Sequence, residues 1–354
     1  MSILKIAKTK IHQAAKKAIR TVVPKGIKLL ELGLTPLAGA SVERIQHYSA
    51  ITQLSAAVGP GLAAKLLPLL EFKKGRFYVD LYQDGGDFVA NGRKYTYPGM
   101  KNSPIVLGSP HDISFYQVEG IHPDNETQGT QETQAFSFLN KYVLMPTKSG
   151  KLLLLTDNHN HALFGWALAK ELGLTDVEAS LIHVDAHLDA DNPDYARPGI
   201  PKGQTLADFK AWSREFADIA SFLMPGYGSL FGDVTYVNTK NNGKGSDYRL
   251  GDQHGWRQEG QVLSVELMAN RMCELKAAGK KVILDLDLDY FAHYFQHEPD
   301  SGVTAKQRIS LEENLQQVIA LARQADFITV ATSLDWFFDQ PKAIELFNEI
   351  VKNL

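Results

Sequence analysis

The spacing of hydrophobic and polar positions changes twice along the chain. Residues 40–72 repeat apolar positions at helical intervals and predict helices, with Ser41 as a candidate N-cap. Between residues 76 and 146 the apolar positions alternate instead, in short runs separated by Gly, Pro, Asn and Asp, which predicts an antiparallel β-meander. Asn91-Gly92, between two of these runs, predicts a tight hairpin turn.

After Lys151 the pattern becomes one of short apolar runs that alternate with amphipathic stretches. The apolar runs predict strands at 152–156, 180–186, 234–238, 281–289 and 327–333. Between them we expect helices, two of them closed by Gly173 and Gly279 and one opened by a capping box at Ser310. Strands that alternate with helices predict an α/β fold of three layers, with helices on both faces of a parallel sheet. The expected parts of the chain are a helical segment (1–72), a β-rich segment (73–150) and an α/β domain (151–354).

The beginning of the chain is strongly basic. Eight of the 37 Lys and Arg residues lie in residues 1–28, together with none of the 40 Asp and Glu residues, so the remaining chain is acidic and unsuited to nucleic acid. Residues 1–23 have the pattern of a basic amphipathic helix, which docks on the body, on a second copy of the chain or on a membrane surface; we favour the first two. The single cysteine, Cys273, excludes an internal disulfide framework. With no secretory signal pattern, the cytoplasm is the expected location.

Three of the predicted strands end in clusters of carboxylates and imidazoles. The clusters are Asp157-Asn158-His159-Asn160-His161, Asp185-Ala186-His187-Leu188-Asp189 and Asp285-Leu286-Asp287-Leu288-Asp289. Alternate residues of a strand point the same way, so the acidic and imidazole side chains within each of the last two clusters project together. Because α/β sheets bind ligands beyond the carboxyl ends of their strands, we expect all three clusters in one crevice. His183 and His293 are expected to be packed or to face solvent rather than to bind a metal.

Carboxylates at this density must be neutralised, because like charges raise the pKa of one another. Two divalent cations and a bridging hydroxide would bring four carboxylates to a net charge of about −1. The donors are mostly oxygen with one or two nitrogens and no thiolate, which favours Mn²⁺ over zinc. We therefore predict two Mn²⁺ per chain, in a site that lowers the pKa of a shared water and supplies a nucleophile at neutral pH.

These motifs resemble a known family. Asp185-Ala186-His187-Leu188-Asp189 is similar to the DAHxD signature of the ureohydrolase superfamily (arginase, agmatinase, formiminoglutamase), and Asp287-Leu288-Asp289 is similar to its later DxD element. His159 and His161 stand where that family has a Gly-Gly-Asp-His-Ser turn. The motifs are most similar to the peptide-arginase branch, which converts arginine to ornithine within ribosomally made precursor peptides. The resemblance covers residues 151–351.

The resemblance implies a dinuclear manganese centre and assigns its ligands. Asp185 and Asp287 would bridge the two ions, His187 and Asp289 would complete one, and Asp189 with a histidine would complete the other. That histidine is His159 if the strand ends are overlaid without a gap, or His161 if the following small residue is matched. Asp285 would lie behind the ligands, unless the register of the last motif is shifted by two residues.

The chain departs from arginases at two functional positions. Arginases carry a Glu after the last strand that pairs with the guanidinium, whereas here only Asp335 could substitute. Their proton-shuttling histidine follows soon after DAHxD, whereas the only similar dipeptide here is His254-Gly255, in a Gly- and Asn-rich stretch (225–260) that could form a rim over the site. Both departures favour an arginine-containing precursor peptide over free arginine. Hydroxide would attack the guanidinium carbon, and His254 would protonate the leaving amine as urea departs.

Three other functions remain open at this point. Another ureohydrolase would act on a small guanidino compound through the same centre. An amidohydrolase of arginase fold would act on acylated amines and would bind a single zinc ion. A non-catalytic scaffold would keep the metal and use the N-terminal half to recruit a partner, which the missing guanidinium-binding Glu would permit.

Overall fold

The computed structural model describes most of the chain after residue 41. The described residues are 42–79, 87–90, 93–96, 105–120, 134–190, 206, 222–237, 246–251, 257–263, 265–295, 310–334 and 339–354. The chain divides into two compact units, Met1–Asp80 and Leu81–Leu354. The basic helix predicted for residues 1–23, and Ser41, lie outside the described residues.

The first unit contains the predicted helices and one hairpin. Its elements are α2 (Val42–Val58), α3 (Pro60–Leu66), the 3₁₀ turn η2 (Leu67–Leu69), β1 (Leu70–Lys73) and β2 (Arg76–Val79). The helical prediction is confirmed as far as Leu69 and is wrong for the last three residues, which form β1. Phe72 pairs across the hairpin with Phe77, and the two rings lie 5.3 Å apart. This aromatic cross-strand contact favours the strand over a further helical turn.

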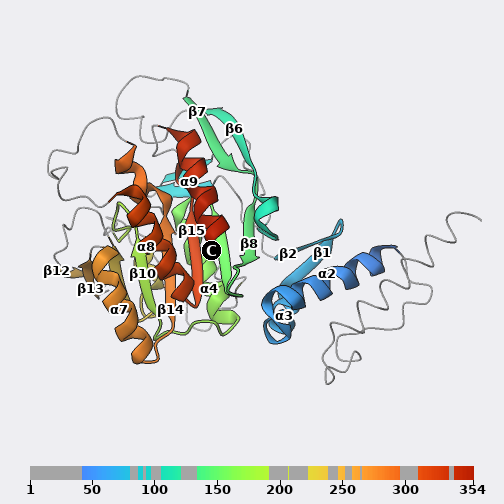
Figure 1. Ribbon diagram of the computed structural model, residues 1–354, viewed down its shortest axis with the longest axis horizontal. Helices are drawn as coiled ribbons and strands as arrows, with labels where there is room; N and C mark the ends of the chain where they lie inside the picture. The colour runs from blue at the N-terminus through green and yellow to red at the C-terminus, as the bar shows by residue number, and fades with distance from the viewer. Residues whose placement is uncertain are drawn as a thin grey trace, which may run out of the picture. The chain divides into compact units, whose positions relative to one another are not determined.

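The second unit is built on a large, mostly parallel sheet (Figure 1). The five strands predicted after Lys151 are present as β9 (Leu152–Thr156), β10 (Ser180–Val184), β11 (Asp233–Val237), β14 (Val282–Asp287) and β15 (Phe327–Ala331). β10 and β14 end before the predicted residues 186 and 289, so the prediction that the whole of each polar cluster alternates along a strand is wrong; it holds for Asp285 and Asp287. They lie in the order β9-β15-β14-β10-β11, and all neighbours in this series are parallel. Beyond β11 the sheet continues with β13 (Arg257–Leu263), which is parallel to β11, and β12 (Ser246–Gly251), which is antiparallel to β13. Both come from the stretch predicted as a rim over the site.

Helices cover both faces of this sheet, which confirms the α/β prediction. The principal helices are α4 (Ala162–Glu171), α7 (Val265–Ala277), α8 (Leu311–Gln324) and α9 (Gln340–Asn353). Figure 1 shows α7, α8 and α9 side by side over one face. α4 connects β9 to β10, whereas α7 connects β13 to β14 and α8 connects β14 to β15, in the opposite direction across the sheet. Because such crossovers are right-handed, α4 lies on the opposite face from α7 and α8. At Gly165 of α4 an added Cβ would lie 2.7 Å from Leu154 Cδ2 and 3.0 Å from Thr329 Cγ2, so this helix lies very close to the sheet.

The β-rich segment differs from the predicted meander. β3 (Asp87–Ala90) and β4 (Arg93–Thr96) form the predicted antiparallel pair, with Ala90 paired to Arg93. The later strands are β5 (Ile105–Leu107), β6 (Phe115–Gly120), β7 (Gln134–Leu139) and β8 (Tyr142–Pro146). β6 and β7 pair with each other as a separate hairpin, whereas β5 is parallel to β8 and β8 is antiparallel to β9. Because that hairpin intervenes, the chain enters β8 in the same direction as β5, and the two strands extend the large sheet.

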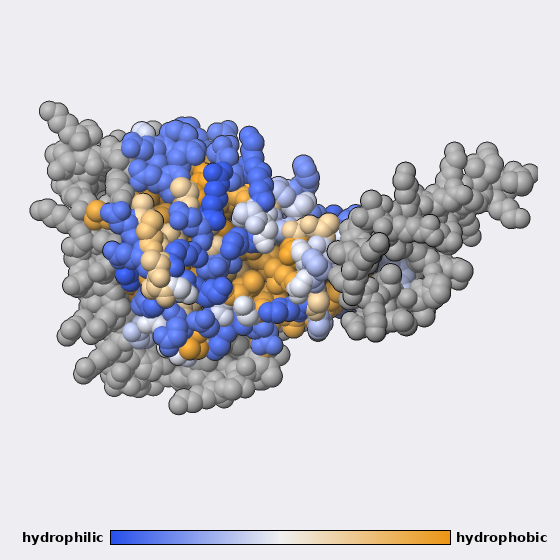
Figure 2. Space-filling model, turned by 60° about the horizontal axis from the view of Figure 1, so that its bottom comes forward, coloured by the Kyte–Doolittle hydropathy of each residue, from blue (hydrophilic) through white to orange (hydrophobic). Residues whose placement is uncertain are grey.

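The surface that can be seen is largely polar. Figure 2 shows hydrophilic side chains over much of the described part of the view. Among the described residues, the large hydrophobic side chains that are exposed are Val177 and Leu188. None of the helices in the described ranges is long and apolar enough to cross a lipid bilayer.

Candidate metal centre

The polar clusters lie together at one edge of the sheet, because the four strands β9, β15, β14 and β10 are neighbours and parallel. His159 opens a 3₁₀ turn after β9, Asp185 follows β10, and Asp287 ends β14. His183 pairs in register with Asp285 across neighbouring strands, so their side chains point to the same face of the sheet. That face is the one covered by α4.

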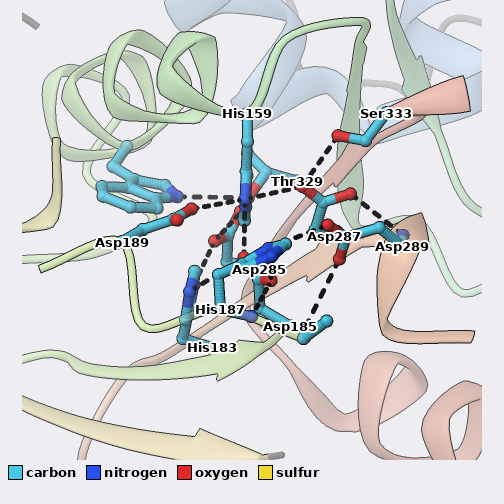
Figure 3. A network of polar contacts seen from close by, with 12 residues as sticks. His159, His183, Asp185, His187, Asp189, Asp285, Asp287, Asp289, Thr329 and Ser333 are labelled. Carbon is cyan, nitrogen blue, oxygen red and sulfur yellow. Dashed lines mark hydrogen bonds and ion pairs between the residues drawn. The ribbon is translucent and has the colours of Figure 1, made fainter. Parts of the chain in front are cut away.

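His159 lies at the centre of the first group of side chains (Figure 3). Its Nδ1 atom is 2.9 Å from Asp185 Oδ2, 2.9 Å from Asp189 Oδ2 and 3.0 Å from Asp287 Oδ2. All four residues are buried. One ring nitrogen can donate a single hydrogen bond, so it cannot satisfy three carboxylate oxygens at this distance. Three carboxylates converging on an imidazole nitrogen are instead the donor set of a hard divalent cation.

A second group shares Asp185 with the first. His187 Nδ1 lies 3.0 Å from Asp289 Oδ2 and 3.5 Å from Asp185 Oδ1. The side chain of His187 is 51% exposed, whereas that of Asp289 is 3% exposed. The possible ligand atoms of Asp185, His187 and Asp289 all lie within 4.8 Å of one another. The same is true of those of His159, His183, Asp185 and Asp189. Two cation positions that share one carboxylate therefore fit the residues, one closed and one open to solvent.

Asp285 and His183 lie behind these groups. Asp285 Oδ2 is 2.7 Å from His159 Nε2 and 2.8 Å from His183 Nδ1, and Asp285 Oδ1 accepts a hydrogen bond from Thr329 Oγ1 at 2.5 Å. The sequence leaves open whether Asp285 binds a metal or lies behind the ligands; in the structure its oxygens face His159, His183 and Thr329. His183 is buried, and its Nε2 atom is 3.2 Å from Asp185 Oδ2, so it belongs to the cluster rather than to the general packing. Its position two residues before Asp185, on the strand that leads to it, is the signal that could have identified it.

The other predicted residues have different outcomes. The structure brings His159 rather than His161 into the two groups. The ring of His161 lies edge-on to Tyr142, with 5.3 Å between the centroids. Asp335 and His254 lie outside the described residues, so their predicted roles stay predictions.

The loop after β15 adds hydrogen bonds to two of the carboxylates of the site. Ser333 Oγ donates a hydrogen bond to Asp287 Oδ2 at 2.8 Å, and the φ angle of Ser333 is +38°. A positive φ in a non-glycine residue costs free energy and is common at functional sites. Asp157 Oδ1 accepts hydrogen bonds from Leu139 N at 2.8 Å and from Thr332 Oγ1 at 2.9 Å. Asp157 thus joins the end of β7 to the ends of β9 and β15.

The pKa values of the acidic residues are shifted in both directions. Burial alone would raise the pKa of Asp185 and Asp285, but hydrogen bonds and charge from the neighbouring histidines outweigh it and hold the pKa below its ordinary value. In Asp189 and Asp289, burial and the negative charge of neighbouring carboxylates raise the pKa, to about 7 for Asp189 and well above its ordinary value for Asp289. Hydrogen bonds to Asp185 and Asp289 raise the pKa of His187 to about 11. The cluster alone therefore retains protons near neutral pH, and a bound cation would neutralise the same charges.

Comparisons with known proteins leave the family open. No family model matches the chain, and no curated protein matches it. Among solved structures, the chain is similar to a crystal structure described as a hypothetical agmatinase from Burkholderia thailandensis, with a TM-score of 0.34 and 14% sequence identity. The similarity covers 60% of this chain and 57% of that one, so the chain spans little more than half the length of that protein. A likeness of this size assigns neither family nor activity, and the case for a metal centre rests on the side chains themselves.

Proposed function

We propose that the protein is a metal-dependent hydrolase that cleaves a C–N bond of a guanidinium group and binds two Mn²⁺ ions per chain. The observation that carries the proposal is the sharing of Asp185 between a closed group around His159 and an open group around His187. The order of the motifs along the chain, which resembles that of ureohydrolases, supports the same reaction.

The residues of the chain fit this chemistry. Divalent cations held by the two groups would lower the pKa of a water molecule and so supply the nucleophile at neutral pH. The carboxylates attract a guanidinium cation electrostatically, and the half-exposed His187 marks the side open to substrate. The oxygen of water adds to the guanidinium carbon, and the bond from that carbon to the substituted nitrogen breaks. The two protons of the water go to the substituted nitrogen. The products are urea and a protonated amine.

We further propose that the guanidinium belongs to an arginine within a peptide, which becomes ornithine. The resemblance of the motifs to the peptide-arginase branch supports this substrate, as does the lack of a Glu in residues 327–336, the last strand and the residues directly after it. Asp335 would then pair with the guanidinium and His254 would protonate the leaving amine. A peptide substrate requires an open approach, and the exposure of His187 and Leu188 favours one.

The test combines metal content with urea release. Protein loaded with Mn²⁺ is assayed on an arginine-containing peptide, agmatine and free arginine, and we expect two Mn²⁺ per chain and urea from the peptide. Asp185→Asn should abolish both, while Asp176→Asn, on an exposed loop, should preserve both. Unchanged metal content and hydrolysis in Asp185→Asn would contradict the mechanism. Bound metal without urea from any substrate would favour acylated amines or a scaffold role.

A further inference from the structure

Asp285 is a buried carboxylate whose two oxygens are both used by protein donors. Its Oδ2 atom faces His159 Nε2 and His183 Nδ1, and its Oδ1 atom accepts the hydrogen bond from Thr329. The Thr329 hydroxyl in turn accepts a hydrogen bond of 3.1 Å from Nε1 of Trp166 in α4. Asp285 is fully buried, at 0% exposure, so no water competes for these bonds. The carboxylate is engaged by the protein and is not placed to bind a cation.

Two imidazole rings span the distance from Asp285 to the shared carboxylate of Asp185. The rings of His159 and His183 are stacked, with 8° between their planes and 5.1 Å between their centroids. Each ring has one nitrogen on Asp285 Oδ2 and the other nitrogen near Asp185 Oδ2, at 2.9 Å for His159 and 3.2 Å for His183. The nitrogens that face Asp185 are buried and make no hydrogen bond of good geometry. The two rings are therefore held at both ends by the same two carboxylates (Figure 3).

The two histidines are not equivalent toward a cation. His159 Nδ1 has three carboxylate oxygens within 3.0 Å, whereas among the described residues His183 Nε2 has an ion pair with Asp185 alone, at 3.2 Å. More carboxylates surround the nitrogen of His159, so His159 is the better ligand for a cation in the closed position. His183 is then left in contact with Asp185.

We propose that Asp285 and His183 are positioning residues of the metal centre, an inference that rests on the proposed function. By accepting the hydrogen bond from His159 Nε2, Asp285 fixes the tautomer that presents the Nδ1 lone pair to the cation. His183 connects Asp285 to Asp185, and so fixes the orientation of the carboxylate that both cation positions share. Thr329 orients Asp285. Carboxylates that orient metal-binding histidines typically contribute about 10- to 100-fold to metal affinity or activity.

The matched pair Thr329→Val and Thr329→Ser tests this role without changing a residue that touches a cation. Valine keeps the shape of threonine without the hydroxyl, and serine keeps the hydroxyl without the methyl. Mn²⁺ affinity is measured by competition with a fluorescent chelator, and thermal unfolding is measured on the metal-free protein. We expect Thr329→Val to weaken affinity about 2- to 10-fold, the equivalent of one hydrogen bond, and Thr329→Ser to stay close to wild type. Equal affinities in the two variants, or losses that merely follow the unfolding temperature, would overturn the proposal.

Two direct variants extend the test. Asp285→Asn removes the anionic acceptor, and His183→Phe keeps a ring against His159 but removes both nitrogens. Each should weaken Mn²⁺ binding by about 10- to 100-fold. Wild-type affinity in both variants would refute this inference and leave the proposed function intact, whereas a wild-type protein that binds no Mn²⁺ would refute the proposed function itself.

Discussion

Alanine at Gly165 would test how tightly α4 packs against the strands that carry the metal centre. The nearest neighbours of the added methyl are Leu154 Cδ2 at 2.7 Å and Thr329 Cγ2 at 3.0 Å. Both side chains are fully buried, and the β-branched Thr329 has little rotameric freedom. The new methyl can therefore be accommodated only by movement of the helix or of these two side chains.

The expected cost follows from two opposing effects. Overpacking a well-packed core by one methyl group costs about 1–3 kcal/mol. Replacing glycine by alanine within a helix stabilises the helix by up to about 1 kcal/mol. We therefore expect the free energy of unfolding of the second unit to fall by about 1–2 kcal/mol.

Urea unfolding followed by circular dichroism measures the change. Gly61→Ala is the matched control, because Gly61 lies in helix α3 and no atom lies within 4 Å of its added Cβ; this variant should not lose stability. Leu154→Val removes the Cδ2 atom that clashes, so the double variant should be more stable than the sum of the single changes predicts, by about 1 kcal/mol. A neutral or stabilising Gly165→Ala, or strict additivity of the two changes, would refute the steric argument.

Other expected outcomes concern pH, helix capping and metal release. Burial alone would raise the pKa of Asp326, but hydrogen bonds from Lys276 and a backbone amide lower it below its ordinary value. Its contribution to stability is therefore present above the unfolded pKa of about 4 and is lost as the pH falls through the folded pKa, so Asp326→Asn should flatten the acid side of the stability profile. Ser310→Ala should lower the free energy of unfolding by about 1 kcal/mol and Ser310→Asp should not, because the side chain caps α8 by accepting from Glu313 N. A chelator should remove Mn²⁺ in two phases, and His187→Ala should accelerate only the faster one, because His187 lies on the open side; a single phase unaffected by this change would contradict the two unequal positions.

The strands of the parallel sheet could be predicted because their residues are mostly apolar and both faces of the sheet are buried. β9, β14 and β15 are entirely buried; β9 reads Leu152-Leu-Leu-Leu-Thr156, β14 begins with Val282-Ile-Leu284, and β15 reads Phe327-Ile-Thr-Val-Ala331. The place of the candidate site could be predicted as well. Its carboxylates follow the carboxyl ends of parallel strands, which is where such sheets bind ligands.

Pairing partners and contacts inside the apolar runs could not be predicted in the same way. β5 (Ile105-Val-Leu107) and β8 (Tyr142-Val-Leu-Met-Pro146) are short, mostly buried apolar runs, and nothing in their sequences says that the two strands are parallel. β13 reads Arg257-Gln-Glu-Gly-Gln-Val-Leu263 and lacks an apolar run, so its place beside β11 follows from the sheet rather than from its own residues. His183 interrupts an apolar strand, and the carboxylates of Asp285 and Asp185 on either side of its ring explain why an imidazole is stable there.

The hydrogen bonds of Asp157 have a consequence for how the protein can be divided. Its buried Oδ1 atom depends on the amide of Leu139, which belongs to a strand well before the α/β segment. A fragment that began near Lys151 would lack that amide and would also lose β8 from the edge of β9. Leaving a buried polar group without a hydrogen-bond partner costs about 1–3 kcal/mol, and more for a charged group. The shortest fragment that can retain the candidate metal centre should therefore begin before β7, within the second unit.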